Sequence, residues 1–114
     1  NAGNAVSTGT QNVLIGHEAG NTLAAHNNTT CVGYNAGKGA TAANCTIVGN
    51  KACGTGTMSG GNNTAIGYLA GEDLEAGAQN TLLGGYTAMM LGHKLLVAHR
   101  RQLQDRLIVL SSVH

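Results

Sequence analysis

The chain has 114 residues and a net charge of +1, with no Phe, Trp or Pro, three Tyr and 18 Gly. Chains of this size normally bury about two-thirds of their unfolded surface, yet large apolar side chains are scarce here and Gly loses more backbone entropy on folding than any other residue. This composition argues against a self-contained enzyme and favours stacked repeats, in which neighbouring units supply the missing contacts.

The charges divide the chain into two segments. Residues 1–88 carry two Lys against four acidic residues, a net −2, whereas residues 89–114 carry four basic residues against Asp105, a net +3. We place a boundary at residue 88. Residues 1–88 contain no basic stripe, so we expect no nucleic-acid partner. No apolar run approaches the about 20 residues of a membrane-spanning helix, and no membrane partner is expected.

Residues 1–88 repeat one nine-residue pattern five times. The copies are NVLIGHEAG at 12–20, TTCVGYNAG at 29–37, CTIVGNKAC at 45–53, NTAIGYLAG at 63–71 and NTLLGGYTA at 80–88. Their central glycines, spaced 17, 16, 18 and 17 residues apart, are Gly16, Gly33, Gly49, Gly67 and Gly84. In the last copy Gly85 fits the central position equally well. Asn1-Ala2-Gly3 matches the end of an earlier copy, so we expect an excerpt of a longer array.

Each column of the repeat has a physical interpretation. An aliphatic residue precedes the central glycine and Val or Thr lies two residues before that, an alternation typical of a short β-strand. The third residue after the glycine is Ala in four copies and Thr87 in the fifth, as a crowded inward position requires. We therefore expect coils lined by Ala and Val. The polar spacers, such as 22–28 and 55–62, have no helical period and are expected to form turns and outer strands.

The copy Asn-Thr-Ala-Ile-Gly-Tyr-Leu-Ala-Gly at 63–71 resembles the "NTAIGYNAG" repeats of phage and algal-virus tail fibres, and is similar to the head repeats of trimeric autotransporter adhesins. The resemblance covers residues 1–88. It implies an all-β fold, a β-solenoid or β-roll of about five 17-residue repeats interwound as a homotrimer. It also implies display outside a cell or on a virion, where such segments hold a receptor-binding tip or bind host glycans or receptors themselves. It brings no catalytic residue, cofactor or metal.

Two other functions are open. The segment Ile15–Gly20 also satisfies the hexapeptide rule of left-handed β-helix acyltransferases, as do 32–37, 48–53, 66–71 and 83–88, although the spacers break the rule. In such an enzyme His26 would be the general base. The second alternative is an ice-binding solenoid with a flat Thr/Asn face. The hydroxyls would come from Thr29, Thr30, Thr46, Thr55, Thr57 and Thr64. A regular ladder of two Thr per coil is missing.

We expect any binding surface at the variable positions after the central glycines, because loops on rigid scaffolds carry function. They give four candidate surface-binding residues, His17, Tyr34, Asn35 and Tyr68. Tyr34 and Tyr68 share one column and could stack against sugars, or they could simply cover the flank of the solenoid.

Three cysteines, Cys31, Cys45 and Cys53, follow no C-x-x-C spacing. We interpret them as small buried residues that replace Ala, Leu or Gly in the repeat, with a metal site or a disulfide as the alternatives.

Residues 89–114 lack the repeat. Leu96, Leu103, Leu107 and Leu110 would share one helical face, which Arg100 interrupts. We predict a short basic amphipathic helix that caps the solenoid or forms a trimeric coiled coil. A membrane-surface helix and a tail foreign to the natural protein are the alternatives.

Overall fold

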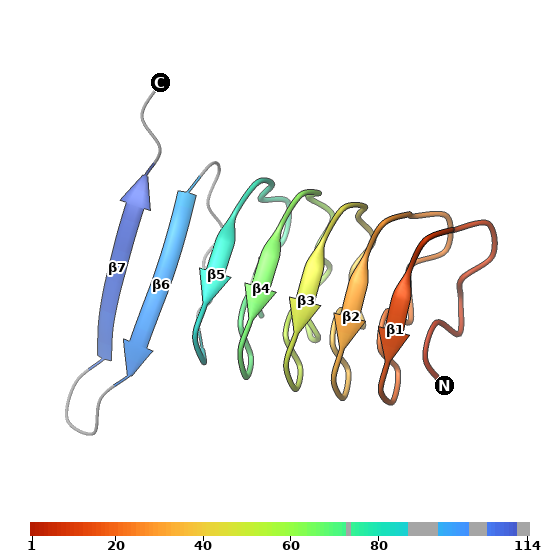
Figure 1. Cartoon of the computed structure of the whole chain (residues 1–114), viewed down its shortest axis with the longest axis horizontal. Coiled ribbons are helices and arrows are strands. Elements are labelled where there is room, and N and C mark those ends of the chain that lie inside the picture. Colours follow the sequence, from red (N-terminus) through yellow and green to blue (C-terminus); the bar gives the residue numbers. More distant parts are fainter. Residues whose placement is uncertain (73, 87–93, 101–104, 112–114) are drawn as a thin grey trace.

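The computed structural model describes residues 1–72, 74–86, 94–100 and 105–111, the last two ranges as strands. It is all-β, and five parallel strands form a β-solenoid of about four turns (Figure 1). The strands are β1 (Val13–Ile15), β2 (Thr30–Val32), β3 (Thr46–Val48), β4 (Thr64–Ile66), β5 (Thr81–Leu83), β6 (Lys94–Arg100) and β7 (Asp105–Ser111). The predicted fold class is confirmed, and each of β1–β5 lies where a copy of the repeat placed a strand.

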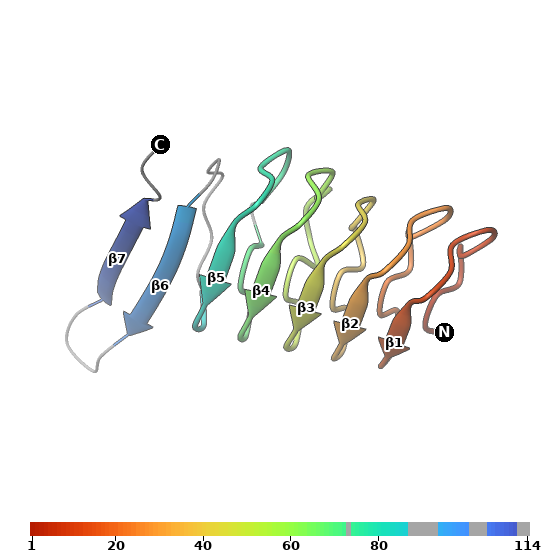
Figure 2. The same cartoon turned by 45° about the horizontal axis from the view of Figure 1, so that its top comes forward.

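Strands β1–β5 pair in register, so that equivalent residues of the repeat form straight columns. Val13 pairs with Thr30, Thr30 with Thr46, and the column continues to Thr81. The register holds although the repeats are 16 to 18 residues long. The spacers, which turn behind the ladder (Figure 2), therefore absorb the extra and missing residues. They form turns rather than the outer strands that we predicted; among the described residues their one bridge joins Ala40 to Met58.

The interior is a narrow core between the ladder and the spacers. The middle residue of each strand faces inward, and the small residue after the central glycine is buried in the first four copies, as predicted. The expectation of a Val lining is wrong, because Val32 and Val48 face outward on the ladder. Buried residues of the spacers line the opposite wall instead, namely Leu23, Ala40, Met58 and Leu74.

The central glycines are sites of close approach between coils. Gly67 has a φ of +136°, and a Cβ built on it would lie 2.6 Å from the carbonyl carbon and oxygen of Gly84. Gly49 makes the same kind of approach to Gly67. Gly84, with φ +116°, continues this column and its N–H donates to the Ile66 carbonyl. Gly84, not Gly85, is therefore the central glycine of the last copy.

Asparagines that are buried or half-buried join successive coils just before the strands. The Asn12 Nδ2 group donates to the His26 carbonyl at 2.9 Å, and the Asn12 Oδ1 atom accepts the Thr29 N–H at 3.0 Å. Asn63 repeats the arrangement one residue before β4: its Nδ2 donates to Gly60 and Gly77 carbonyls, and its Oδ1 accepts the Asn80 N–H at 2.8 Å. Because buried polar groups are costly when unpaired, these side chains help to fix one coil onto the next.

The three cysteines are free thiols that fill the core, as predicted. Cys31 takes the place of Leu14 in the inward strand column, and Cys45 takes that of the coupling asparagine. Cys53 occupies a column that glycine holds in three other copies, Gly20, Gly37 and Gly71, and has a φ of +47°. Burial raises the pKa of Cys31 and Cys53 to about 12. Since the thiolate is the nucleophile and the metal ligand, these groups are chemically inert at neutral pH.

The helix predicted within residues 89–114 is wrong for the ranges that the structure describes. Lys94–Arg100 and Asp105–Ser111 are strands; β6 pairs parallel with β5 and antiparallel with β7. The edge of β5 offers unpaired backbone N–H and C=O groups that an incoming strand satisfies, whereas a short isolated helix is marginally stable. The second segment thus extends the same sheet. The boundary predicted at residue 88 lies outside the described residues, as does Thr87.

Candidate functional site

The outward side of β1–β5 is a flat surface made of two columns. Because side chains alternate along a strand, the first and third residues of each strand point away from the core. We call these two columns the outer face: Val13, Thr30, Thr46, Thr64 and Thr81 in the first, and Ile15, Val32, Val48, Ile66 and Leu83 in the second.

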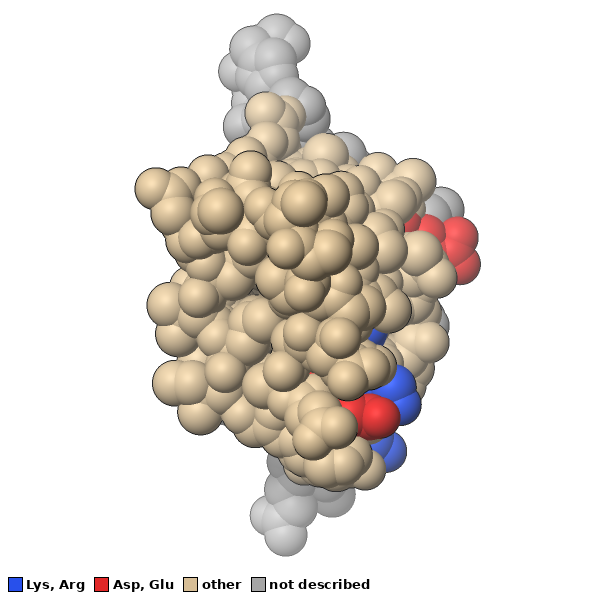
Figure 3. Space-filling view, turned by 90° about the vertical axis from the view of Figure 1, so that its right-hand side faces the viewer, with Lys and Arg blue, Asp and Glu red and all other residues tan. Residues whose placement is uncertain are grey.

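The outer face carries no charged residue, and one of its two columns is aliphatic. Ile15 is 59% exposed and Ile66 is 39% exposed, large values for aliphatic side chains in a regular sheet. None of the fifteen residues of β1–β5 is charged. Seen from the N-terminal end of the stack, the visible charged atoms gather along one side of the molecule (Figure 3). An exposed aliphatic column beside a hydroxyl column makes this face a candidate interaction surface.

The first column of the outer face carries a ladder of hydroxyl groups. Thr30, Thr46, Thr64 and Thr81 are direct neighbours in the parallel register, so that their spacing is the strand separation of about 4.8 Å. The adjacent column is aliphatic, and one Thr per coil is therefore the full extent of the ladder on these strands.

The hexapeptide-type motifs begin on the outer face. The aliphatic residue that opens each of them, such as Ile15 or Ile66, lies on the outer face. His26, the general base of the acyltransferase alternative, takes part in the coil through its backbone: its carbonyl accepts from Asn12 and its N–H donates to the Leu23 carbonyl at 3.4 Å.

A second surface runs along the turns that follow the strands. We call it the aromatic edge and define it as His17, Tyr34, Tyr68 and Tyr86. The His17 ring stacks on the Tyr34 ring of the next coil, with centroids 5.4 Å apart and an interplanar angle of 16°. The Tyr68 and Tyr86 rings meet edge to face at 5.2 Å. The edge thus consists of two aromatic pairs, separated in the stack by the coil of Asn50.

Backbone hydrogen bonds place the aromatic edge. The N–H of the residue after each variable position donates to the carbonyl of the previous coil, as Lys51 does to Tyr34 at 2.8 Å and Tyr86 does to Tyr68 at 2.7 Å. The donor residues have φ between 56° and 60°, a left-handed conformation that non-Gly residues rarely adopt. This fixed turn keeps His17, Tyr34 and Tyr68 in one column, whereas Tyr86 belongs to the adjacent left-handed column.

Three of the four predicted surface residues lie on the aromatic edge. His17, Tyr34 and Tyr68 are exposed. Asn35 is half-buried at φ 56°, and its Oδ1 atom is shielded from solvent, so it belongs to the turn more than to the surface. Tyr86 was missed, because the consecutive Gly84 and Gly85 left the last copy ambiguous. The left-handed column of the repeat, which Tyr86 shares with Asn35, is the signal that finds it.

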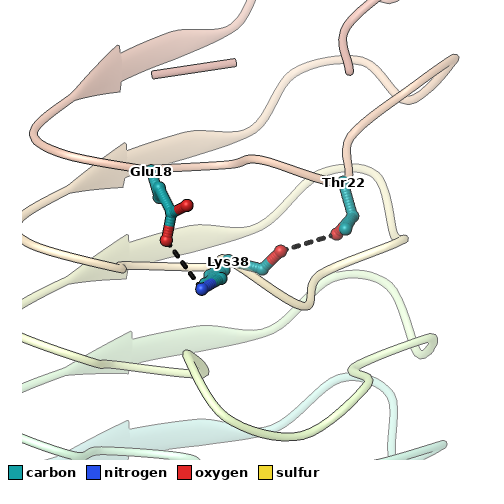
Figure 4. Close-up of polar contacts among 3 residues, drawn as sticks. All are labelled: Glu18, Thr22 and Lys38. Carbon is teal, nitrogen blue, oxygen red and sulfur yellow. Dashed lines mark hydrogen bonds and ion pairs between the residues drawn. The ribbon is translucent and has the colours of Figure 1, made fainter. Parts of the chain in front are cut away.

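An ion pair bridges two coils beside His17. The Glu18 carboxylate and the Lys38 ammonium are 2.6 Å apart, and the Thr22 hydroxyl donates to the Lys38 carbonyl at 2.8 Å (Figure 4). The hydrogen bond from Lys38 lowers the pKa of Glu18, and the same contact raises the pKa of Lys38. Both groups face solvent, where such pairs contribute little stability. The Glu18–Lys38 pair therefore adds no net charge to this part of the surface.

No described cluster of three or more His, Cys, Asp or Glu side chains has the arrangement of a metal site. Within the described ranges, no helix is long and apolar enough to cross a membrane. Comparison of the chain with family models, with curated proteins and with solved structures finds no match.

Proposed function

We propose that this chain is a structural and adhesive repeat segment of an extracellular or virion-surface fibre, such as a tail fibre or surface adhesin, and that it works as a homotrimer. The observation that carries the proposal is the outer face. A solenoid of this composition has a thin core and leaves an aliphatic column on the outside of its regular sheet. Fibres are assemblies of identical chains, and this face is a surface on which identical chains can pack.

Physical magnitudes favour a contact that grows with the array. Five strands at about 4.8 Å and three residues at about 3.3 Å give the outer face roughly 240 Å². A standard stable interface buries about 800 Å² on each partner. The strands of this chain supply only part of such an interface, and each further coil adds to it. We therefore expect association to strengthen with concentration and with the number of coils.

The threonine ladder supports a second candidate, binding to ice or to another crystalline surface. Four hydroxyl groups in strict register are a repeating array on a flat sheet. The two candidates use the same face in opposite ways, because a trimer would cover it and a crystal binder must leave it open.

Static light scattering over a range of concentrations separates these candidates. A homotrimer of an 11.5-kDa chain has a mass of about 34.5 kDa, three times that value. We expect the mass to rise towards this figure with concentration. A mass that stays at 11.5 kDa would contradict the trimer and favour the threonine-ladder function.

A further inference from the structure

The chain places all three of its tyrosines on one edge of its surface, in two adjacent columns of the repeat. The sequence contains three Tyr and no Phe or Trp, and none of the three enters the core. Tyr34, Tyr68 and Tyr86 are 46, 48 and 53% exposed, all on the aromatic edge. Aromatic side chains contribute the largest buried areas to cores and interfaces. A protein that builds its core from Ala, Cys and Leu and keeps its aromatic rings outside uses those rings for contact with something else.

The aromatic edge has the length of an extended polymer rather than of a small molecule. It runs from the turn after β1 to the turn after β5, four coil steps or roughly 19 Å at the strand spacing. Its rings form two pairs, with centroids 5.4 and 5.2 Å apart. The polar residue Asn50 lies between Tyr34 and Tyr68 in the stack. Two aromatic pairs therefore flank one hydrogen-bonding side chain along the edge.

The charges beside the edge do not favour a polyanion. Lys38 is paired with Glu18, and the nearby turns add Lys51 and Glu72, which carry one charge of each sign. Proteins that stack single-stranded nucleic acid on aromatic rings combine those rings with a positively charged groove. This line is close to neutral. A neutral ligand with apolar ring faces and hydroxyl rims matches it in both respects.

We propose that the aromatic edge binds a neutral, extended glycan whose sugar rings lie against the His17–Tyr34 and Tyr68–Tyr86 pairs. Tyrosine hydroxyls and the Asn50 amide then serve as hydrogen-bonding partners for the sugar hydroxyls. This inference deepens the adhesive part of the proposed function and rests on it, since it names the class of surface molecule that the fibre would contact.

Intrinsic tyrosine fluorescence tests the proposal directly. Because the chain has no Trp and its three tyrosines all lie on the edge, the signal reports on this surface alone. The full chain is titrated with cellohexaose, chitohexaose and mannohexaose, and with a single-stranded oligothymidine as the charged competitor. We expect a saturable change with at least one hexasaccharide and weaker or no binding of the oligonucleotide.

Variants of the aromatic edge connect binding to the rings. Tyr68→Ala and Tyr86→Ala are each expected to weaken hexasaccharide binding at least tenfold in calorimetry, whereas Thr57→Ala, an exposed change in a spacer, leaves it unchanged. Binding by none of the three hexasaccharides, binding that survives both tyrosine changes, or a preference for the oligonucleotide would overturn the inference. Light scattering on the same samples keeps the two proposals distinct: a trimer that binds no glycan refutes only this inference, and a monomer refutes the proposed assembly.

Discussion

The two sides of the β1–β5 ladder follow different rules. The inward column contains Leu, Cys, Ile, Ala and Leu again, and every described coil packs it against a spacer residue such as Leu23 or Met58. The outward columns contain only Thr and aliphatic residues, yet Ile15 and Ile66 remain substantially exposed. Apolar character alone therefore does not distinguish the interior from the surface in this protein.

The two sides differ in how much the size of their side chains varies from coil to coil. The inward column accepts residues from Ala65 to Ile47 because the spacers vary in length and side chain to match it. The outward columns are more uniform, with Thr in four of five positions and a branched aliphatic residue in every position of the other column. A surface that must fit a regular partner has such uniformity, whereas a core can compensate locally. The predictions below probe this difference.

The largest effect is expected at the glycine that separates the strand from its turn. Gly67→Ala places a Cβ 2.6 Å from backbone atoms of Gly84 at a φ of +136°. Backbone atoms cannot move aside as a flexible side chain can, so we expect a loss of about 3 kcal/mol or more in unfolding free energy. Chemical denaturation followed by circular dichroism measures it.

Gly85→Ala is the matched control for this change. A Cβ on Gly85 would lie 3.6 Å from the Tyr68 carbonyl oxygen, an ordinary contact. We expect its effect to stay within about 0.5 kcal/mol. Equal losses for the two variants would show that the close approach of the central glycines does not hold the coils together.

The buried thiols predict an alkaline loss of stability. Burial raises the pKa of the Cys31 thiol from an ordinary value of about 9 to about 12, so this thiol keeps its proton in the folded state well above pH 9. Unfolding above pH 9 therefore releases a proton, so the contribution of this thiol is complete below pH 9 and is lost as the pH rises towards 12.

The measurement is the melting temperature as a function of pH, for the natural chain and for Cys31→Ala. Other groups titrate in the same range, but they are common to both proteins. We expect the melting temperature to fall less steeply above pH 9 in the variant. Parallel curves would contradict the assignment of a protonated, buried thiol at this position.

A smaller loss is expected from the asparagine that couples coils. Asn63→Ala removes the acceptor of the Asn80 N–H and the donor to two carbonyls, which should cost about 1–3 kcal/mol because buried partners are left unpaired. Asn50→Ala, an exposed change on the aromatic edge, should stay within about 0.5 kcal/mol. If both variants melt alike, the asparagine column does not link the coils.

The sequence was sufficient to predict the architecture because each position of the repeat reflects a local constraint. A glycine such as Gly67, a small residue such as Ala70 and a β-branched residue such as Thr64 each report a backbone or packing constraint at a fixed offset. Five copies make such constraints visible in one chain. The strands, the inward Ala column and the buried cysteines were predictable for this reason.

Other features depend on contacts between coils, which the pattern of a single repeat does not show. Leu23 and Met58 lie in spacers of different length and sequence, so their shared role in the core appears only when the coils are stacked. The direction of Val32 and Val48 depends on which side of a two-sided apolar strand the spacers cover. Strand β6 pairs with the edge of β5, and β7 pairs with β6. The helical periodicity of Leu96 and Leu103 gave no indication of this pairing.

The central claim is that the inward column stabilises each coil, whereas the outer face binds other copies of the chain. Light scattering and circular dichroism on Ile66→Lys test it most directly, because Ile66 lies on the outer face and a charge there opposes close packing. The account predicts an unchanged β spectrum and a mass of 11.5 kDa at concentrations where the natural chain approaches about 34.5 kDa. A variant that keeps the mass of the natural chain at every concentration, or one that unfolds, would contradict the claim.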